Sequence, residues 1–176
     1  MSRVAGGVGF VHLRVHSAYS LLEGALPLKT LAYLAAGDRQ PALAMNDTGN
    51  LFGALEFSEK MVETGIQPIV GCQVAVDFAD ASEAGRPGTL PQKHLSDIVL
   101  LAATEEGYWN LVRLVSRSYT ETDGVTRAHI SLDWLTGATE GLICLTGGPG
   151  GPVDRCIASG QQEIAAERLD RQNRRA

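Results

Sequence analysis

The chain has 176 residues, of which 44% are apolar and 20% charged, a composition ordinary for a soluble globular domain or for part of a larger one. Its formal charge of −5 argues against a dedicated nucleic-acid-binding surface, because such a surface needs excess Lys and Arg to neutralise phosphates. The three cysteines are widely spaced, and the sequence has neither a signal peptide nor an apolar run long enough to span a membrane. We therefore expect reduced thiols and a cytoplasmic location.

The first predicted strand covers residues 11–15, where apolar residues alternate with His12, Arg14 and His16. Strict alternation would place these three side chains on one face of the strand. Two histidines on one face suggest a metal site, but a guanidinium that keeps its proton is a poor neighbour for a divalent cation.

Apolar strands and amphipathic helices alternate along the rest of the chain. Further strands are predicted at 41–45, 68–76, 98–102 and 141–146. Helices are predicted from Pro27 to Gly37, from Leu51 toward Thr64 after a cap at Asn50, and after a cap at Thr104. The residues expected on the buried sides of these helices are Leu28, Leu31, Ala32, Ala35, Leu51, Leu55, Val62, Tyr108, Leu111, Val112 and Val115. This alternation is typical of a parallel sheet covered by helices, either closed as a barrel or open and doubly wound.

The remaining segments are expected to be irregular. Residues 1–9 are predicted to be flexible, 80–95 a polar loop, and 161–176 a helix followed by an irregular tail. The glycine-rich stretch 147–152 follows the fifth strand and invites comparison with a phosphate cradle. It matches no phosphate-binding motif, and its two prolines remove N–H donors, which favours a plain turn. Because so few strands are predicted, we expect an incomplete architecture.

Functional residues of parallel α/β sheets gather beyond the carboxyl ends of the strands. Four side chains near predicted strand ends could hold a metal through nitrogen and oxygen: His16, Glu23, Asp47 and Asp97. Asp97 begins its strand and needs a different geometry to join the others. From spacing alone a structural role is favoured over a metal site, because carboxylates at strand ends often cap loops and a lone histidine is more often a hydrogen-bonded structural residue.

Five blocks, in order along the chain, carry a resemblance to a known family: FVHLRVHSAYSLLEGA, NDTGNLFGALEF, GIQPIVGCQV, VLLAATEEGYWNLVRLVS and EGLICLTGG. They resemble the N-terminal PHP (polymerase and histidinol phosphatase) domain of the bacterial DNA polymerase III α subunit. The resemblance implies a distorted (β/α)7 barrel, with residues 1–176 forming its N-terminal portion of about five β/α units. It also implies a parent DNA-directed DNA polymerase whose polymerase region is not in this sequence.

The resemblance implies a degenerate metal site. Metal-binding members resemble HLHVHS, so that Arg14 stands where a ligand histidine would be. The vestigial ligand positions are His16, Glu23, Asp47 and Asp97, and the replaced positions are Arg14, Thr48, Gln73 and Gly148. Because clustered carboxylates repel one another unless a cation lies among them, we expect Arg14 to form an internal ion pair with Glu23 and Asp47.

Two functions follow from the resemblance. The first is a structural and interaction domain without catalytic residues, metal or cofactor, in which Mg²⁺ serves only the parent polymerase. The alternative is a metal-dependent phosphoesterase or 3′–5′ exonuclease of the PHP superfamily, which would need residual Zn²⁺ or Mn²⁺ binding. Expected partners are the rest of the α subunit and the proofreading exonuclease subunit, with DNA reached only through the parent and no membrane contact.

Overall fold

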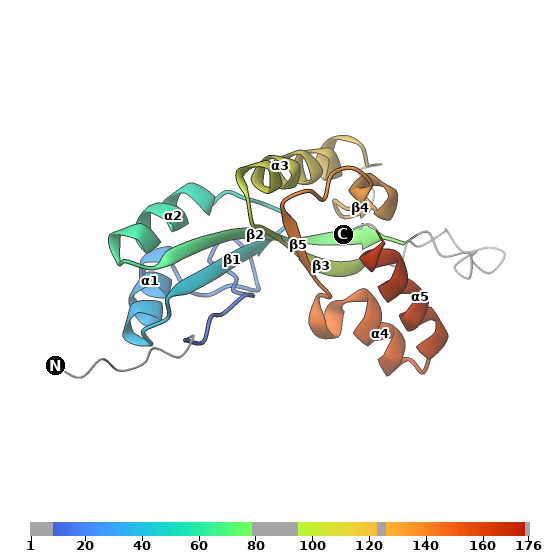
Figure 1. Ribbon diagram of the computed structural model, residues 1–176, viewed down its shortest axis with the longest axis horizontal. Coiled ribbons are helices and arrows are strands. Elements are labelled where there is room, and N and C mark those ends of the chain that lie inside the picture. Colours follow the sequence, from blue (N-terminus) through green and yellow to red (C-terminus); the bar gives the residue numbers. More distant parts are fainter. Residues whose placement is uncertain (1–8, 79–94, 123–125, 175–176) are drawn as a thin grey trace.

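The computed structural model describes residues 9–78, 95–122 and 126–174, which form a mixed sheet with helices packed on it (Figure 1). The strands are β1 (Ala42–Thr48), β2 (Gln67–Asp77), β3 (Ser96–Ala102), β4 (Ile130–Ser131) and β5 (Leu142–Leu145). The helices are α1 (Leu28–Gly37), α2 (Ala54–Glu63), α3 (Glu105–Thr120), α4 (Pro152–Ala158) and α5 (Gln162–Asn173), with short 3₁₀ helices η2 (Leu132–Leu135) and η3 (Gly148–Gly150). The predictions for 1–9 and 80–95 fall almost entirely outside the described residues.

The sheet is not all parallel, so that prediction is wrong. Its order is β1-β2-β3-β5, with β4 beside the end of β2. β1 and β2 are parallel, whereas β3 is antiparallel to both β2 and β5. Antiparallel neighbours can be joined by a simple loop, whereas parallel neighbours need a crossover connection, such as the helix α2 between β1 and β2. The reversed β3 brings its first residues beside the carboxyl end of β2, where Asp97 pairs with Ala75.

The predicted first strand, 11–15, is also wrong. This segment is irregular, although it lies along β1 and two of its carbonyls accept hydrogen bonds from that strand. The backbone N–H groups of Ala44 and Asn46 bond to the carbonyls of His12 and Val15, each at 2.9 Å. The segment therefore covers part of the outer edge of β1 without forming a regular ladder.

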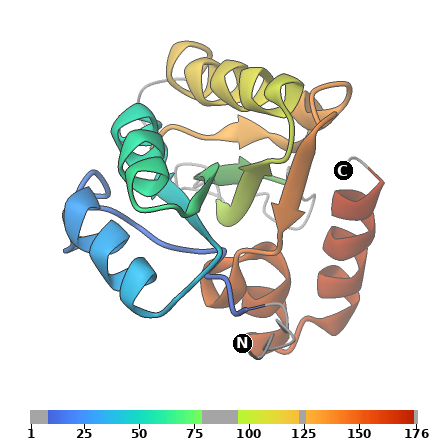
Figure 2. The ribbon, with the colours of Figure 1, turned by 60° about the vertical axis from the view of Figure 1, so that its left-hand side comes forward.

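Helices α2 and α3 cover one side of the sheet (Figures 1 and 2), and α1 packs with α2 against the Leu43 and Met45 side chains of β1. In α1 the four residues predicted to be buried are buried, and α3 begins as predicted, with the Thr104 hydroxyl accepting a bond from the Gly107 N–H. In α2 the prediction was wrong for Leu55 and Val62, which are exposed. The helix instead buries Ala54, Phe57 and Met61, because the i, i+3, i+7 stripe of these residues faces the sheet.

Helix α4 lies on the other side of the sheet from α3, and α5 follows it at the β5 end of the sheet (Figures 1 and 2). The Arg155 guanidinium ties α4 to the carbonyl of Leu95, just before β3, at 2.8 Å. The predicted tail helix exists and continues to Asn173, further than expected. Its residue Gln172 is buried, and the amide nitrogen of that side chain contacts the Cys144 sulfur. None of the described helices combines the length and the apolar character that crossing a membrane requires.

Candidate functional site

A buried carboxylate organises the loop that follows the N-terminal segment. Asp47, at the end of β1, is 1% exposed and accepts three hydrogen bonds. They come from the Ser17 N–H at 2.7 Å, the Ser17 hydroxyl at 2.7 Å and the Ser20 hydroxyl at 2.6 Å. The Ser20 hydroxyl also lies 3.4 Å from the His16 Nδ1. The carboxylate of Asp47 is therefore occupied by two serine hydroxyls and one backbone N–H group.

The end of β1 sends successive side chains to opposite sides of the sheet. Met45 packs with α1 and α2, and Asp47 shares its side. Thr48 turns to the other side and pairs in register with Gln73 of β2. Two of the sequence positions singled out as neighbours, Asp47 and Thr48, thus face different surroundings.

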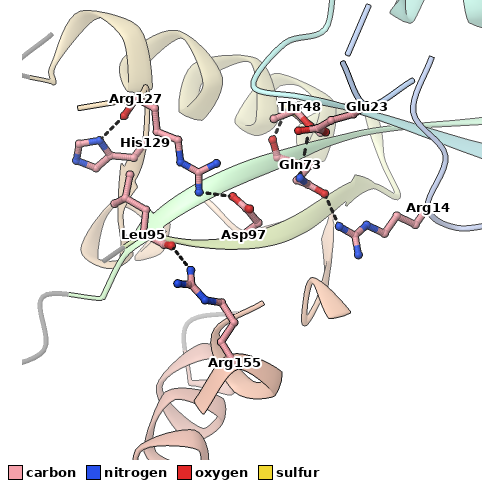
Figure 3. A network of polar contacts seen from close by, with 10 residues as sticks. Arg14, Glu23, Thr48, Gln73, Leu95, Asp97, Arg127, His129 and Arg155 are labelled. Carbon is pink, nitrogen blue, oxygen red and sulfur yellow. Dashed lines mark hydrogen bonds and ion pairs between the residues drawn. The ribbon is translucent and has the colours of Figure 1, made fainter. Parts of the chain in front are cut away.

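A chain of hydrogen bonds runs across the other side of the sheet (Figure 3). The Thr48 hydroxyl donates to Glu23 Oε2 at 2.6 Å, and the Gln73 amide approaches the Thr48 hydroxyl at 3.4 Å. The Arg14 guanidinium donates to Gln73 Oε1 at 2.7 Å and to the Gly147 carbonyl at 2.8 Å. We call these five residues, Arg14, Glu23, Thr48, Gln73 and Gly147, the strand-end network.

The expected ion pair of Arg14 with Glu23 and Asp47 is not formed, which corrects the prediction. In the described part of the chain the guanidinium bonds only to the neutral oxygens of Gln73 and Gly147. Glu23 is satisfied by Thr48, and Asp47 by the serines. The physical reason is that Asp47 faces the helices, while Glu23 is separated from Arg14 by two intervening side chains.

Asp97 forms an ion pair with a residue that sequence reasoning missed. Arg127, in the connection after α3, places its NH2 group 2.7 Å from Asp97 Oδ1 (Figure 3). The carboxylate side chain is 20% exposed and the arginine side chain 48% exposed. No local pattern marks Arg127, because its position depends on the reversed direction of β3.

The glycine-rich stretch after β5 forms η3 and leads into α4, as the predicted turn requires. Gly147 has φ +81°, and a β-carbon there would lie 1.8 Å from the Asp97 carbonyl oxygen. Only glycine fits this position. The turn presents the Gly147 carbonyl, rather than an N–H group, to the Arg14 guanidinium.

The potential ligands are dispersed among these separate contacts. Across the described ranges, no group of three or more His, Cys, Asp and Glu side chains is placed to hold a metal ion. Of the vestigial positions, His16 and Asp47 lie together, whereas Glu23 and Asp97 belong to different contacts. Of the replaced positions, Arg14, Thr48 and Gln73 are joined in the strand-end network, and a β-carbon at Gly148 would lie 3.0 Å from Arg14 NH1.

This chain belongs to the PHP domain family, whose profile matches residues 12–175. Similar relatives are DNA polymerase III α subunits. That of Caulobacter vibrioides is 40% identical over 170 residues, covering 97% of this chain and 14% of the relative. That of Escherichia coli K12 is 37% identical over 158 residues, covering 90% of this chain and 13% of the relative. The chain thus spans about one seventh of the length of the curated relatives it matches.

Among solved structures, an amidohydrolase from Chromobacterium violaceum with bound sulfate and no metal aligns with a TM-score of 0.45 and 24% identity, covering 63% of this chain and 34% of the other. The sequence comparisons confirm the resemblance to the PHP region of the polymerase α subunit, and the mixed α/β fold agrees with part of such a barrel.

Proposed function

We propose that this chain is the N-terminal PHP region of a replicative DNA polymerase α subunit, acting in the cytoplasm as a structural and interaction domain without bound metal. The strand-end network carries this proposal. The positions where the resemblance implies metal ligands are occupied by side chains that bond to one another, and a permanent cation, Arg14, lies among them.

The strand-end network links separate parts of the fold, as ligands shared by a bound metal would. Arg14 belongs to the N-terminal segment, Gln73 to β2 and Gly147 to the turn after β5, so one guanidinium joins three separate parts of the fold. Its planar fork of donors suits such a fixed cross-link. Metal-assisted phosphoester hydrolysis instead requires clustered ligands and an open position for water, and the contacts of Thr48 and Gln73 oppose that use.

The partners follow from this role. The domain would pack against the remainder of the α subunit and bind the proofreading exonuclease subunit, since a PHP region without hydrolytic activity leaves proofreading to another protein. DNA and Mg²⁺ would be engaged by the polymerase region of the parent.

The test has two arms. The purified chain is incubated with single-stranded DNA and Mg²⁺, Mn²⁺ or Zn²⁺, and no digestion is expected. Size-exclusion chromatography with purified proofreading exonuclease subunit is expected to show co-elution. Metal-dependent digestion that disappears in Asp97→Ala, or failure of both this chain and the whole α subunit to co-elute with the exonuclease, would overturn the proposal.

A further inference from the structure

An apolar groove is lined by residues of α3 and of the loop that precedes α2. These two helices lie next to each other in Figure 1. Its cavity volume is about 430 Å³. The lining residues are Gly49, Asn50, Leu51, Phe52, Tyr108, Val112, Val115, Ser116 and Tyr119. None of them belongs to the strand-end network, so the groove is a separate feature of the molecule.

The groove is fixed by its own hydrogen bonds. The Tyr119 hydroxyl donates to the Gly49 carbonyl at 2.9 Å, which joins the end of α3 to the loop after β1. The buried Asn50 amide donates to the Thr48 carbonyl, and its oxygen accepts from the Phe52 N–H. Because these hydrogen bonds already order the surface, binding to it requires little further loss of conformational entropy.

Large apolar side chains continue from the groove onto the exposed side of α2. Phe52 is 79% exposed, Leu55 73% and Val62 67%, and Tyr119 at the end of α3 is 60% exposed. Leu55 and Val62 are not among the lining residues, so an occupant that fills only the cavity would leave them in water. The extent of the apolar surface favours a polypeptide segment over a small molecule.

The charges beside this surface are mostly negative. Exposed Glu56, Glu59 and Glu63 surround a single basic residue of α2, Lys60, whose pKa is raised by its hydrogen bond and charge interaction with Glu63, and further by Glu59 and Glu56. On α3, Glu105 precedes the lining residue Tyr108 by three positions and therefore lies on the same face. A partner with Lys or Arg beside its apolar residues is complementary to this surface.

We infer that the groove binds a segment of a partner protein that carries two or three large apolar side chains flanked by Lys or Arg. The inference rests on the proposed interaction role and adds the surface that performs it. The occupant inserts its apolar side chains against Tyr108, Val112 and Leu51, while its basic groups lie beside the glutamates of α2 and Glu105.

Selection from a displayed library of random 16-residue peptides against the whole chain tests this inference. The selected peptides are expected to be basic and rich in Leu, Ile, Phe or Trp. Measured by fluorescence polarisation with one selected peptide, Phe52→Ser and Val112→Asp should weaken binding at least tenfold. The double variant Glu59→Lys, Glu105→Lys should weaken it severalfold and reduce its salt dependence. Tyr33→Ser, which alters an exposed tyrosine on α1, serves as the matched control and should leave affinity unchanged.

Three results of the peptide experiment would overturn the inference. They are failure to select any peptide, selection of acidic peptides, and binding that Phe52→Ser and Val112→Asp leave intact. Sedimentation that shows a dimer broken by Phe52→Ser would assign the groove to a second copy and would also overturn it. The peptide-binding and sedimentation results do not depend on the nuclease and co-elution experiments. The inference about the groove can therefore fail while the proposed function stands.

Discussion

At the scale of the residue, Arg14 acts as a donor to neutral oxygens. Its guanidinium bonds to the buried amide oxygen of Gln73 and to a backbone carbonyl, and Gln73 is only 5% exposed. A buried acceptor left without its donor costs roughly 1–3 kcal/mol. The importance of Arg14 should therefore come from hydrogen bonding and depend little on the ionisation of acids.

Arg14→Ala should lower the free energy of unfolding by about 1–3 kcal/mol, because it leaves Gln73 Oε1 unsatisfied. The loss should be similar at pH 7 and pH 5, since both acceptors are neutral. Urea unfolding at the two pH values measures it. Arg14→Lys is the matched variant, and it should recover only part of the stability because an ammonium lacks the planar fork. A destabilisation that disappears at the lower pH would instead indicate an ion pair.

Asp47→Ala should be more damaging, by about 3 kcal/mol, since it removes the acceptor shared by three donors in a buried position. Hydrogen exchange of residues 17–24 should accelerate in the same variant. Ser17→Ala, which leaves the Ser17 N–H and the Ser20 hydroxyl in place, should cost less than half as much. Equal stability of the two variants would show that Asp47 does not organise the loop.

The candidate site was only partly predictable at this scale. The sequence identifies which polar residues follow the strands, and Arg14, Thr48 and Gln73 do meet. Their partners could not be predicted, because the acceptor at Gly147 is a backbone carbonyl and any residue type supplies one. Arg127 was missed for a related reason, since its pairing depends on the direction of a distant strand.

At the scale of the element, hydrophobic periodicity predicted four of the five strands and the buried face of α1. It could not give strand direction, because parallel and antiparallel buried strands have the same apolar runs. It also misplaced the buried face of α2, where Leu55 and Val62 compete with Phe57 and Met61 for the core. Tertiary packing, which the sequence pattern does not contain, selected the latter pair.

Cys72 in β2 should resist alkylation in the folded protein. Burial raises the pKa of its thiol to about 12, so the thiolate is scarce at pH 8.5. Because the folded pKa is raised, the associated stability is complete below about pH 9 and is lost as the pH rises toward 12. Iodoacetamide labelling mapped by mass spectrometry should modify Cys72 only in urea. Rapid labelling without denaturant would contradict its burial.

Strand β5 should promote self-association. In the described part of the chain it pairs only with β3, and Ile143 on it is 52% exposed. An apolar strand edge is a template for pairing with another chain, and a lysine opposes it. Ile143→Lys should therefore reduce the association constant about tenfold, equal to about 1.4 kcal/mol, in sedimentation experiments. Ile157→Lys, a comparably exposed change on α4, is the control, and an equal effect of both would reject the edge explanation.

At the scale of the whole molecule, Phe78 connects the core to α5. It is 2% exposed, its carbonyl accepts a bond from Arg171, and the Arg168 guanidinium lies 5.2 Å from its ring centroid. Phe78 thus belongs to the core beneath α3 and also contacts α5.

Phe78→Ala should lower the free energy of unfolding by about 3–5 kcal/mol and increase hydrogen exchange in α5. Phe78→Leu keeps most of the volume and should cost clearly less, which separates cavity formation from loss of the aromatic contact. Urea unfolding and exchange mass spectrometry provide the two measurements. Unchanged exchange in α5 of Phe78→Ala would show that the helix is held by other contacts.

The Arg14 bond to Gly147 has a consequence for the order of folding during synthesis. The two residues are 133 positions apart, so the partner of Arg14 leaves the ribosome on the order of ten seconds after Arg14 itself. Until then β1, β2 and their helices can associate, while the guanidinium remains in water. The backbone around Arg14 can bond to β1 early, through the carbonyls of His12 and Val15, but the guanidinium reaches its final contacts late. In a nascent chain stalled before Gly147, the Arg14 side chain should therefore remain accessible to an arginine-specific reagent.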